Sequence, residues 1–117
     1  MIKKVLLGLA ALFPVGIASF ASIVAPYMAP PTFNVNNSSG EPVQVTAYWR
    51  EKNRNLGEIA PGQKVEFEVN DEAAISFKAR YPNGKELRSR EIYFTTGITI
   101  QAEVTELGIE VNYDPST

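Results

Sequence analysis

Residues 63–81 read QKVEFEVNDEAAISFKARY, with apolar side chains at alternate positions on both sides of a polar NDE triplet. A period of two sends successive side chains to opposite faces of a strand, so that one face can meet a core while the other meets water. The stretch therefore predicts two strands, residues 63–70 and 73–81, joined by a short polar turn at Asn70–Glu72.

The same alternation continues in both directions along the chain. It recurs in residues 32–37, 42–51, 97–105 and 107–114. Trp49, the only tryptophan, is in phase with Val43 and Val45 and is therefore expected in the core. The chain is predicted to be all-β, an antiparallel β-sandwich of seven or eight strands, with a helix expected only in the hydrophobic N-terminal segment.

One hairpin is marked clearly by its turn residues. The segment Tyr81-Pro82-Asn83-Gly84-Lys85 combines a proline with an Asn-Gly pair between two apolar runs. A loop at Pro82–Gly84 places Lys78 opposite Arg88 and Ser76 opposite Arg90 on the paired strands.

The alternation changes phase at two places. Leu87 and Ile92 fall on opposite faces of a regular strand, which predicts a bulge near Ser89–Glu91. The second change is at Thr105–Glu106, which is either a two-residue hairpin loop or a bulge in one long strand. The residues alone leave both alternatives open.

Four segments of the predicted domain share one arrangement of turns and alternating strands. They are Asn34–Ser38, Val43–Thr46, Leu56–Gly62 and Val65–Val69. Together they are similar to small immunoglobulin-like or fibronectin-like modules of exported proteins, and the resemblance covers roughly residues 32–113. It implies a sandwich fold and no particular ligand. The paired cysteines of antibody-type domains are missing, because the chain has no cysteine.

The N-terminus has the layout of a targeting segment. Lys3 and Lys4 precede an uncharged run that continues to Met28, and Ala18–Ala21 offers small residues for cleavage. A secretory signal peptide cleaved after Ala21 fits this layout. A membrane anchor fits as well, because the uncharged run is long enough to span a bilayer.

Both interpretations of this segment give the same domain division. Residues 1–21 are a signal peptide, or an uncleaved anchor that extends to about residue 25. Residues 22–31 form a proline-rich linker, and residues 32–117 form the β-sandwich domain. Either way the domain is expected outside the cytoplasm, in the periplasm, secreted, or anchored at a membrane.

The composition excludes several classes of function. Of the 117 residues, 11 are Lys or Arg, 13 are Asp or Glu, and none is His or Cys, for a net charge of -2. This balance argues against nucleic-acid binding by bulk electrostatics. The lack of His and Cys removes the commonest general base and the usual ligands of zinc and copper. We therefore expect no catalytic residue, no metal and no cofactor, although a hydrolase with two carboxylates remains conceivable.

Basic residues gather around the predicted hairpin, and they are the candidate partner contacts. The four residues are Lys78, Arg80, Arg88 and Arg90. Such a group suits an anionic partner, whether an acidic protein surface, a lipid headgroup or a polyanionic glycan. The competing interpretation is a solvated face whose charges keep an edge strand from aggregating.

Acidic residues recur at other outward positions of the predicted strands. They are Glu66, Glu68, Glu103, Glu110 and Asp114. Opposite charge on different faces suits docking on a charged partner or pairing head to tail. Ordinary solubility accounts for the same pattern.

These observations predict an exported, non-catalytic β-sandwich module that binds another macromolecule, with a protein as the expected partner. One alternative is a single-pass, membrane-anchored accessory subunit of an envelope complex, with membrane contact only if the N-terminal helix is retained. Another is a carbohydrate-binding module in which Tyr48 stacks on sugar together with Tyr27 or Tyr93. No nucleic-acid partner is expected.

Overall fold

The computed structural model of the chain describes residues 29–115, which contain nine strands and no helix. The strands are β1 (Thr32–Asn37), β2 (Val43–Trp49), β3 (Lys52–Ile59), β4 (Lys64–Glu68), β5 (Ala73–Arg80), β6 (Glu86–Arg88), β7 (Ile92–Phe94), β8 (Thr99–Thr105) and β9 (Gly108–Tyr113). The predicted leader and the first part of the predicted linker lie outside the described residues. Within residues 29–115, no helix has the length and apolar character needed to cross a membrane.

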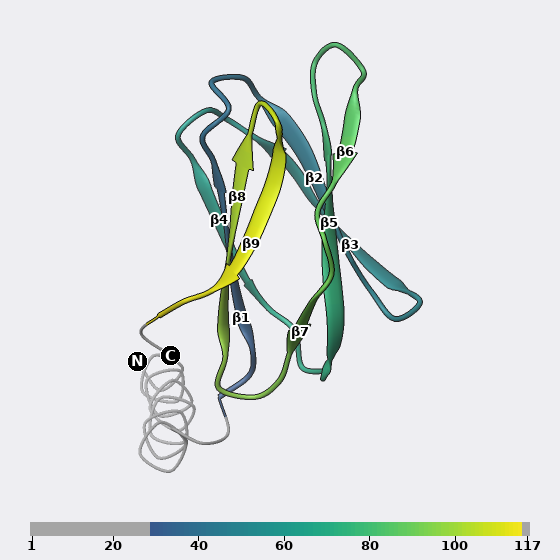
Figure 1. Cartoon of the computed structure of the whole chain (residues 1–117), viewed down its shortest axis with the longest axis vertical. Coiled ribbons are helices and arrows are strands. Elements are labelled where there is room, and N and C mark those ends of the chain that lie inside the picture. Colours follow the sequence, from purple (N-terminus) through teal and green to yellow (C-terminus); the bar gives the residue numbers. More distant parts are fainter. Residues whose placement is uncertain (1–28, 116–117) are drawn as a thin grey trace, which may run out of the picture.

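The strands form two sheets that face each other across a common core (Figure 1). One sheet has the order β4-β1-β8-β9; the other has the order β3-β2-β5-β6, with β7 also paired to β5. All pairs are antiparallel except β1 with β8, so the prediction of a purely antiparallel sandwich is wrong at this pair. The whole second sheet separates β1 from β8 in the sequence, and so long a connection allows a parallel alignment.

The core consists of the inward positions of the alternating strands. Phe33 packs against three other phenylalanines, with ring centroids 5.0 Å from Phe67, 5.1 Å from Phe94 and 6.5 Å from Phe77. Trp49 is buried as predicted, with 8% of its surface exposed. Because this chain has no disulfide, the stability of the domain rests on this apolar contact between the two sheets.

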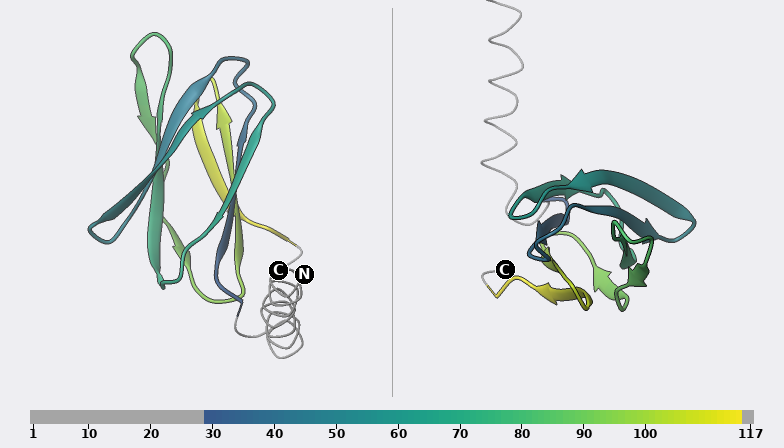
Figure 2. Two further views of the ribbon diagram at one scale, coloured as in Figure 1. Left: turned by 180° about the vertical axis from the view of Figure 1, so that it is seen from behind. Right: turned by 90° about the horizontal axis from the view of Figure 1, so that it is seen from above.

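The sequence pattern missed strand β3, so the predicted count of seven or eight strands is too low. All four residues of its first half, Lys52–Asn55, are exposed, and they show no apolar alternation. A bulge where Leu56 and Gly57 meet β2 shifts the register, and Gly57 adopts a positive φ of 78° there. The β2–β3 hairpin projects from the side of the sandwich (Figure 2). A strand that buries little apolar surface leaves little signal in the sequence.

The bulge predicted near Ser89–Glu91 is confirmed. Lys78 lies opposite Arg88, but the next ladder pairs Ile75 with Ile92, which adds one residue to the edge. The Ser89 hydroxyl lies inside the bulge, where it accepts a hydrogen bond from the Phe77 amide at 2.9 Å. The extra residue also removes Arg90 from the predicted position opposite Ser76.

The second phase change is a hairpin loop and not a bulge. Thr105 pairs with Gly108, so the loop is Glu106–Leu107, one residue later than the predicted position. The Thr105 hydroxyl accepts a hydrogen bond from the Leu107 amide at 3.2 Å. This side-chain contact stabilises a loop whose residues are otherwise poor turn formers.

Asn37 is an inward polar residue at the end of β1, and it is completely buried. Its Nδ2 donates to the carbonyls of Glu41 and Ile59 at 2.7 and 2.8 Å. Its Oδ1 accepts from the amide and the hydroxyl of Ser39, at 3.0 and 2.7 Å. The side chain thus uses all its hydrogen-bonding capacity to fix the β1–β2 turn and the end of β3.

Candidate binding surface

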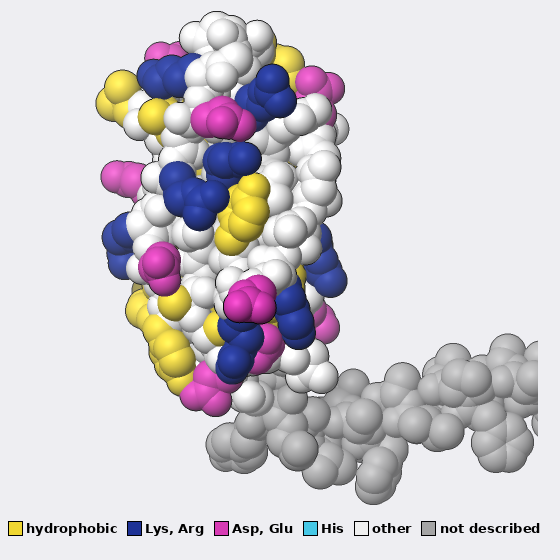
Figure 3. Space-filling model, turned by 90° about the vertical axis from the view of Figure 1, so that its right-hand side faces the viewer, with side chains coloured by type: hydrophobic (Ala, Val, Ile, Leu, Met, Phe, Trp, Pro, Cys, Tyr) yellow, Lys and Arg dark blue, Asp and Glu magenta, His cyan; other side chains and the backbone are white. Residues whose placement is uncertain are grey.

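Three of the four predicted contact residues share the outer face of the β3-β2-β5-β6 sheet. Lys78 and Arg80 come from β5 and Arg88 from β6, at positions that alternate with the inward Ala79 and Leu87. Figure 3 looks onto this side of the molecule, where Lys and Arg side chains lie beside a hydrophobic side chain near the middle of the face. The alternation that builds the core therefore also brings these cations to one surface.

Tyr48 of β2 organises two of these cations. The Arg88 Cζ lies 4.5 Å from the centroid of the Tyr48 ring, and the Lys78 Nζ lies 5.7 Å from it. Both distances allow cation–π attraction, which holds long side chains that would otherwise be mobile. We call Tyr48, Lys78 and Arg88 the basic–aromatic cluster.

The role of Tyr48 was not foreseen, although its outward direction was. Parity along β2 places Tyr48 on the outer face, but its contact with Arg88 crosses β5, from β2 to β6. The register that sets Thr46 opposite Lys78, and Tyr48 opposite Ser76, depends on pairing between distant segments. No local signal in the chain specifies that register.

The charge of the cluster is only partly neutralised. Lys78 forms an ion pair with Glu86 at 3.5 Å. The hydrogen bond with Tyr48, and then the charge of Glu86, raise the pKa of Lys78 above its usual value, so Lys78 stays protonated. Within residues 29–115, neither Arg80 nor Arg88 forms an ion pair with a carboxylate. Two guanidinium groups thus remain open to an external anion.

Arg90, the fourth predicted residue, lies apart from the other three. The bulge turns it toward the other sheet, where its Nη2 donates to the carbonyl of Val111 on β9 at 2.6 Å. Arg54 makes a similar bridge on the opposite side of the sandwich, from β3 to the Glu68 carbonyl of β4 at 3.2 Å, and also covers the Phe67 ring. Each arginine closes one open side of the sandwich, which gives Arg90 a structural contact that the sequence did not indicate.

Substitution should distinguish Arg90, which bridges the two sheets, from Arg88, which lies on the outer face. We expect Arg90→Ala to lower the free energy of unfolding by about 1 to 2 kcal/mol, because it removes a charged donor from the Val111 carbonyl. Arg88→Ala removes only an exposed cation–π contact with Tyr48 and should cost about 0.5 kcal/mol. Urea denaturation of both variants measures the difference, and equal losses would contradict this assignment.

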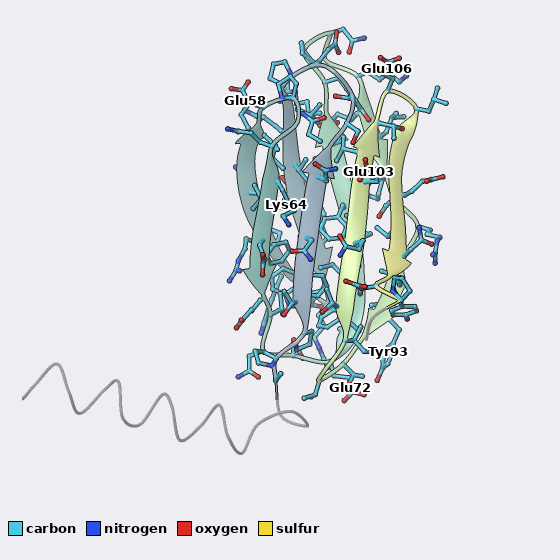
Figure 4. The ribbon with its side chains drawn as sticks, turned by 90° about the vertical axis from the view of Figure 1, so that its left-hand side faces the viewer. Glu58, Lys64, Glu72, Tyr93, Glu103 and Glu106 are labelled. Carbon is cyan, nitrogen blue, oxygen red and sulfur yellow. The ribbon has the colours of Figure 1, made fainter. Side chains whose placement is uncertain are left out.

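Two of the three tyrosines considered for sugar stacking, Tyr48 and Tyr93, lie in the described part of the chain, and each makes another contact. Tyr48 has Arg88 over its ring, and Tyr93 lies on β7, where its hydroxyl is hydrogen-bonded to the Glu72 carboxylate at one end of the sandwich (Figure 4). That bond raises the pKa of Tyr93. Tyr113 donates to the Tyr93 carbonyl at 2.7 Å. Tyr27, the other predicted partner, lies outside the described residues.

The outer face of the β4-β1-β8-β9 sheet carries the five predicted acids, and Figure 4 labels Glu103 and Lys64 on it. We call it the acidic face, and its charged residues are Glu66, Glu68, Glu103, Glu110, Asp114 and Lys64. Five carboxylates against one ammonium group give a net charge of -4. Glu103 accepts hydrogen bonds from Asn36 and Ser38, which come from β1 and the turn after it.

The predicted polar turn at Asn70–Glu72 is held by two contacts of Asp71. Asp71 accepts the Glu72 amide at 2.7 Å and pairs with the Arg50 Nε at 3.2 Å. The hydrogen bond from the Glu72 amide, together with the charge of Arg50, lowers the pKa of Asp71, although partial desolvation opposes the shift. Among residues 29–115, no group of three His, Cys, Asp or Glu side chains is placed to hold a metal ion.

Known proteins are similar to this chain in fold and not in sequence. The sequence matches no protein-family model, and no curated protein matches it. A solved structure of a protein from Eubacterium rectale is similar to this chain with a TM-score of 0.53 and 12% identity, over 72% of this chain and 87% of that one. A candidate cell adhesion protein from Bacteroides uniformis is similar with a TM-score of 0.50 and 12% identity, over 73% of this chain and 49% of that one. This chain therefore spans about half the length of the second protein. At such identities the likeness supports a β-sandwich-like fold, without confirming the immunoglobulin or fibronectin type.

Proposed function

We propose that this chain is an exported, non-catalytic β-sandwich module that binds an acidic surface of another protein. The observation that carries the proposal is the basic–aromatic cluster, in which Tyr48 holds Arg88 and Lys78 on the outer face of the second sheet. Arg80 extends the same face on β5. The likeness in fold to a candidate cell adhesion protein is compatible with a binding role.

A protein surface suits this arrangement because the Arg88 guanidinium and the Lys78 ammonium are held beside Tyr48 before the partner arrives. A side chain that is already restrained loses less conformational entropy on binding. Arg80 and Arg88 form no ion pair with a carboxylate in the described residues, and each can bind an external carboxylate by donating two parallel hydrogen bonds. The proposed role is recognition and not chemistry, because the sequence has no His and no Cys and so lacks the commonest general base and thiolate nucleophile.

Export is proposed from the N-terminal pattern of two lysines and a long uncharged run. The last residues of the predicted linker are bonded to the domain, since the Ala29 carbonyl accepts the Gly97 amide and the Pro31 carbonyl accepts the Val69 amide. A retained anchor would therefore hold the domain close to the membrane. The mass of the native protein distinguishes that membrane-anchored alternative from a cleaved, free module.

The binding proposal is tested with the double variant Lys78→Ala/Arg88→Ala. Its matched control is Lys52→Ala/Lys64→Ala, which removes the same charge at exposed positions on other strands. We expect wild-type protein to bind immobilised poly-L-glutamate, used as a model acidic protein surface, with an affinity that falls steeply with salt. The cluster variant should bind roughly five- to tenfold more weakly, since each lost contact is worth up to about 1 kcal/mol.

The control decides whether position matters or charge alone. An unchanged affinity in Lys52→Ala/Lys64→Ala supports the cluster as the contact site. Equal loss in both double variants, or binding that does not respond to salt, contradicts it.

A further inference from the structure

The outer faces of the two sheets lie on opposite sides of the molecule, one seen in Figure 3 and the other in Figure 4, and their strands carry net charges of opposite sign. The acidic face has a net charge of -4 from five carboxylates and Lys64. The other face carries Lys78, Arg80 and Arg88 against Glu58 and Glu86, for a net charge of +1. The chain thus carries both members of a complementary pair of surfaces.

We propose that the partner of the basic–aromatic cluster is the acidic face of a second copy of this chain. This inference rests on the proposed function, because it uses the same cluster and names its partner. Within the described residues, Arg80 and Arg88 form no ion pair with a carboxylate, and Glu66, Glu68 and Glu110 form no ion pair with a cation. Stacking one copy on the next pairs the two sets of charges.

Both edges of the first sheet and the β6–β7 edge of the second are less suited to self-association than the faces. On edge strand β4, the Glu68 carbonyl already accepts a hydrogen bond from Arg54. On edge strand β9, the Val111 carbonyl accepts one from Arg90. The β6–β7 edge is interrupted by the bulge at Ser89–Glu91. An incoming strand needs a continuous row of free backbone groups, so these features favour contact between faces.

The contact is heterologous, because it joins two different surfaces. Each copy that binds leaves one acidic face and one basic–aromatic cluster open at the ends, so that the assembly grows as a linear stack. Four strands of five to seven residues cover roughly 400 Å² at the usual rise and strand spacing, about half of the roughly 800 Å² per partner of a stable complex. A single contact is therefore weak, and salt should weaken it further.

A heterologous contact can be tested by mixing two defective variants. The basic-face variant is Lys78→Ala/Arg88→Ala, and the acidic-face variant is Glu66→Gln/Glu68→Gln/Glu110→Gln. Each keeps one intact surface and lacks the other. Sedimentation equilibrium at high protein concentration and low salt, on the chain as recovered from an exporting host, measures their masses alone and together.

We expect the mass of wild-type protein to rise continuously with concentration at low salt and to fall to that of one chain at high salt. Each variant alone should remain a monomer, whereas an equimolar mixture should form a 1:1 dimer that does not grow further. The control for this experiment is Lys52→Ala/Lys85→Ala, which removes two exposed lysines that belong to neither surface and should still assemble as the wild type does. Circular dichroism of each variant confirms that it is folded.

Other outcomes overturn the inference and separate it from the proposed function. If the mixture stays monomeric while wild-type protein still binds poly-L-glutamate through the cluster, the second copy is not the partner but the binding role survives. If neither self-association nor poly-L-glutamate binding depends on Lys78 and Arg88, both proposals fail. Association that persists at high salt and in every variant arises from another part of the chain.

Discussion

Phe33→Ala is expected to lower the free energy of unfolding by about 3 to 5 kcal/mol, a large part of the total for a domain of this size. The Phe33 side chain is completely buried and contacts phenylalanines from both sheets. Its removal leaves a cavity at the point where the two sheets meet, and the surrounding backbone ladders cannot move in to fill it. Urea denaturation followed by tryptophan fluorescence measures the loss through Trp49, which lies in the same core.

Phe33→Leu is the matched control, because leucine keeps most of the volume and the apolar character. Its cost should stay below about 1.5 kcal/mol. If Phe33→Ala proves too unstable to purify, the ordering of melting temperatures among wild type, Phe33→Leu and Phe33→Val carries the test. A loss from Phe33→Ala as small as that from Phe33→Leu would show that this ring does not join the sheets.

Asn37→Ala should cost about 2 to 4 kcal/mol, although it removes a polar side chain. The substitution leaves the carbonyl of Ile59 buried without the donor that it has at 2.8 Å, and it also frees the Glu41 carbonyl and Ser39. A buried polar group without a partner loses its hydration without compensation, and this penalty explains the expected size.

Asn36→Ala is the matched control, since Asn36 is the adjacent residue on the opposite face of β1. Its Nδ2 contacts the Glu103 carboxylate at 3.2 Å near solvent, so its loss should cost less than about 1 kcal/mol. Asn37→Asp keeps the shape but turns an acceptor toward two carbonyls, and should be at least as destabilising as Asn37→Ala. Equal stability of Asn36→Ala and Asn37→Ala in chemical denaturation would contradict the assigned role of Asn37.

Charge and stability are separated between the faces and the sides of this molecule. The outer face of one sheet holds the basic–aromatic cluster, and that of the other is the acidic face. Arg54 and Arg90 instead bridge the two sheets at the two sides of the sandwich. Substitution of the cluster should therefore change binding with little effect on folding. Substitution of Arg54 or Arg90 should do the opposite, because each holds one sheet against the other.

Local patterns predicted the parts of this fold that are local in origin. The alternation over residues 63–81 predicted β4 and β5, and the Pro-Asn-Gly loop predicted the register that sets Lys78 opposite Arg88. Both follow from the two-residue period of a strand and from turn geometry. The same reasoning missed β3, because an edge strand with an exposed first half need not alternate.

By itself, the sequence determined which side chains face the core, where the clearest turns lie and which catalytic groups the chain lacks. The tertiary structure alone decided which strands are neighbours, and with that the parallel β1–β8 pair, the ring of Tyr48 beside Arg88 and the separate position of Arg90. The physical reason is that side-chain alternation depends only on the residues of the strand itself. Pairing between strands depends instead on how the whole set buries its apolar surface at once, and no single segment encodes that choice.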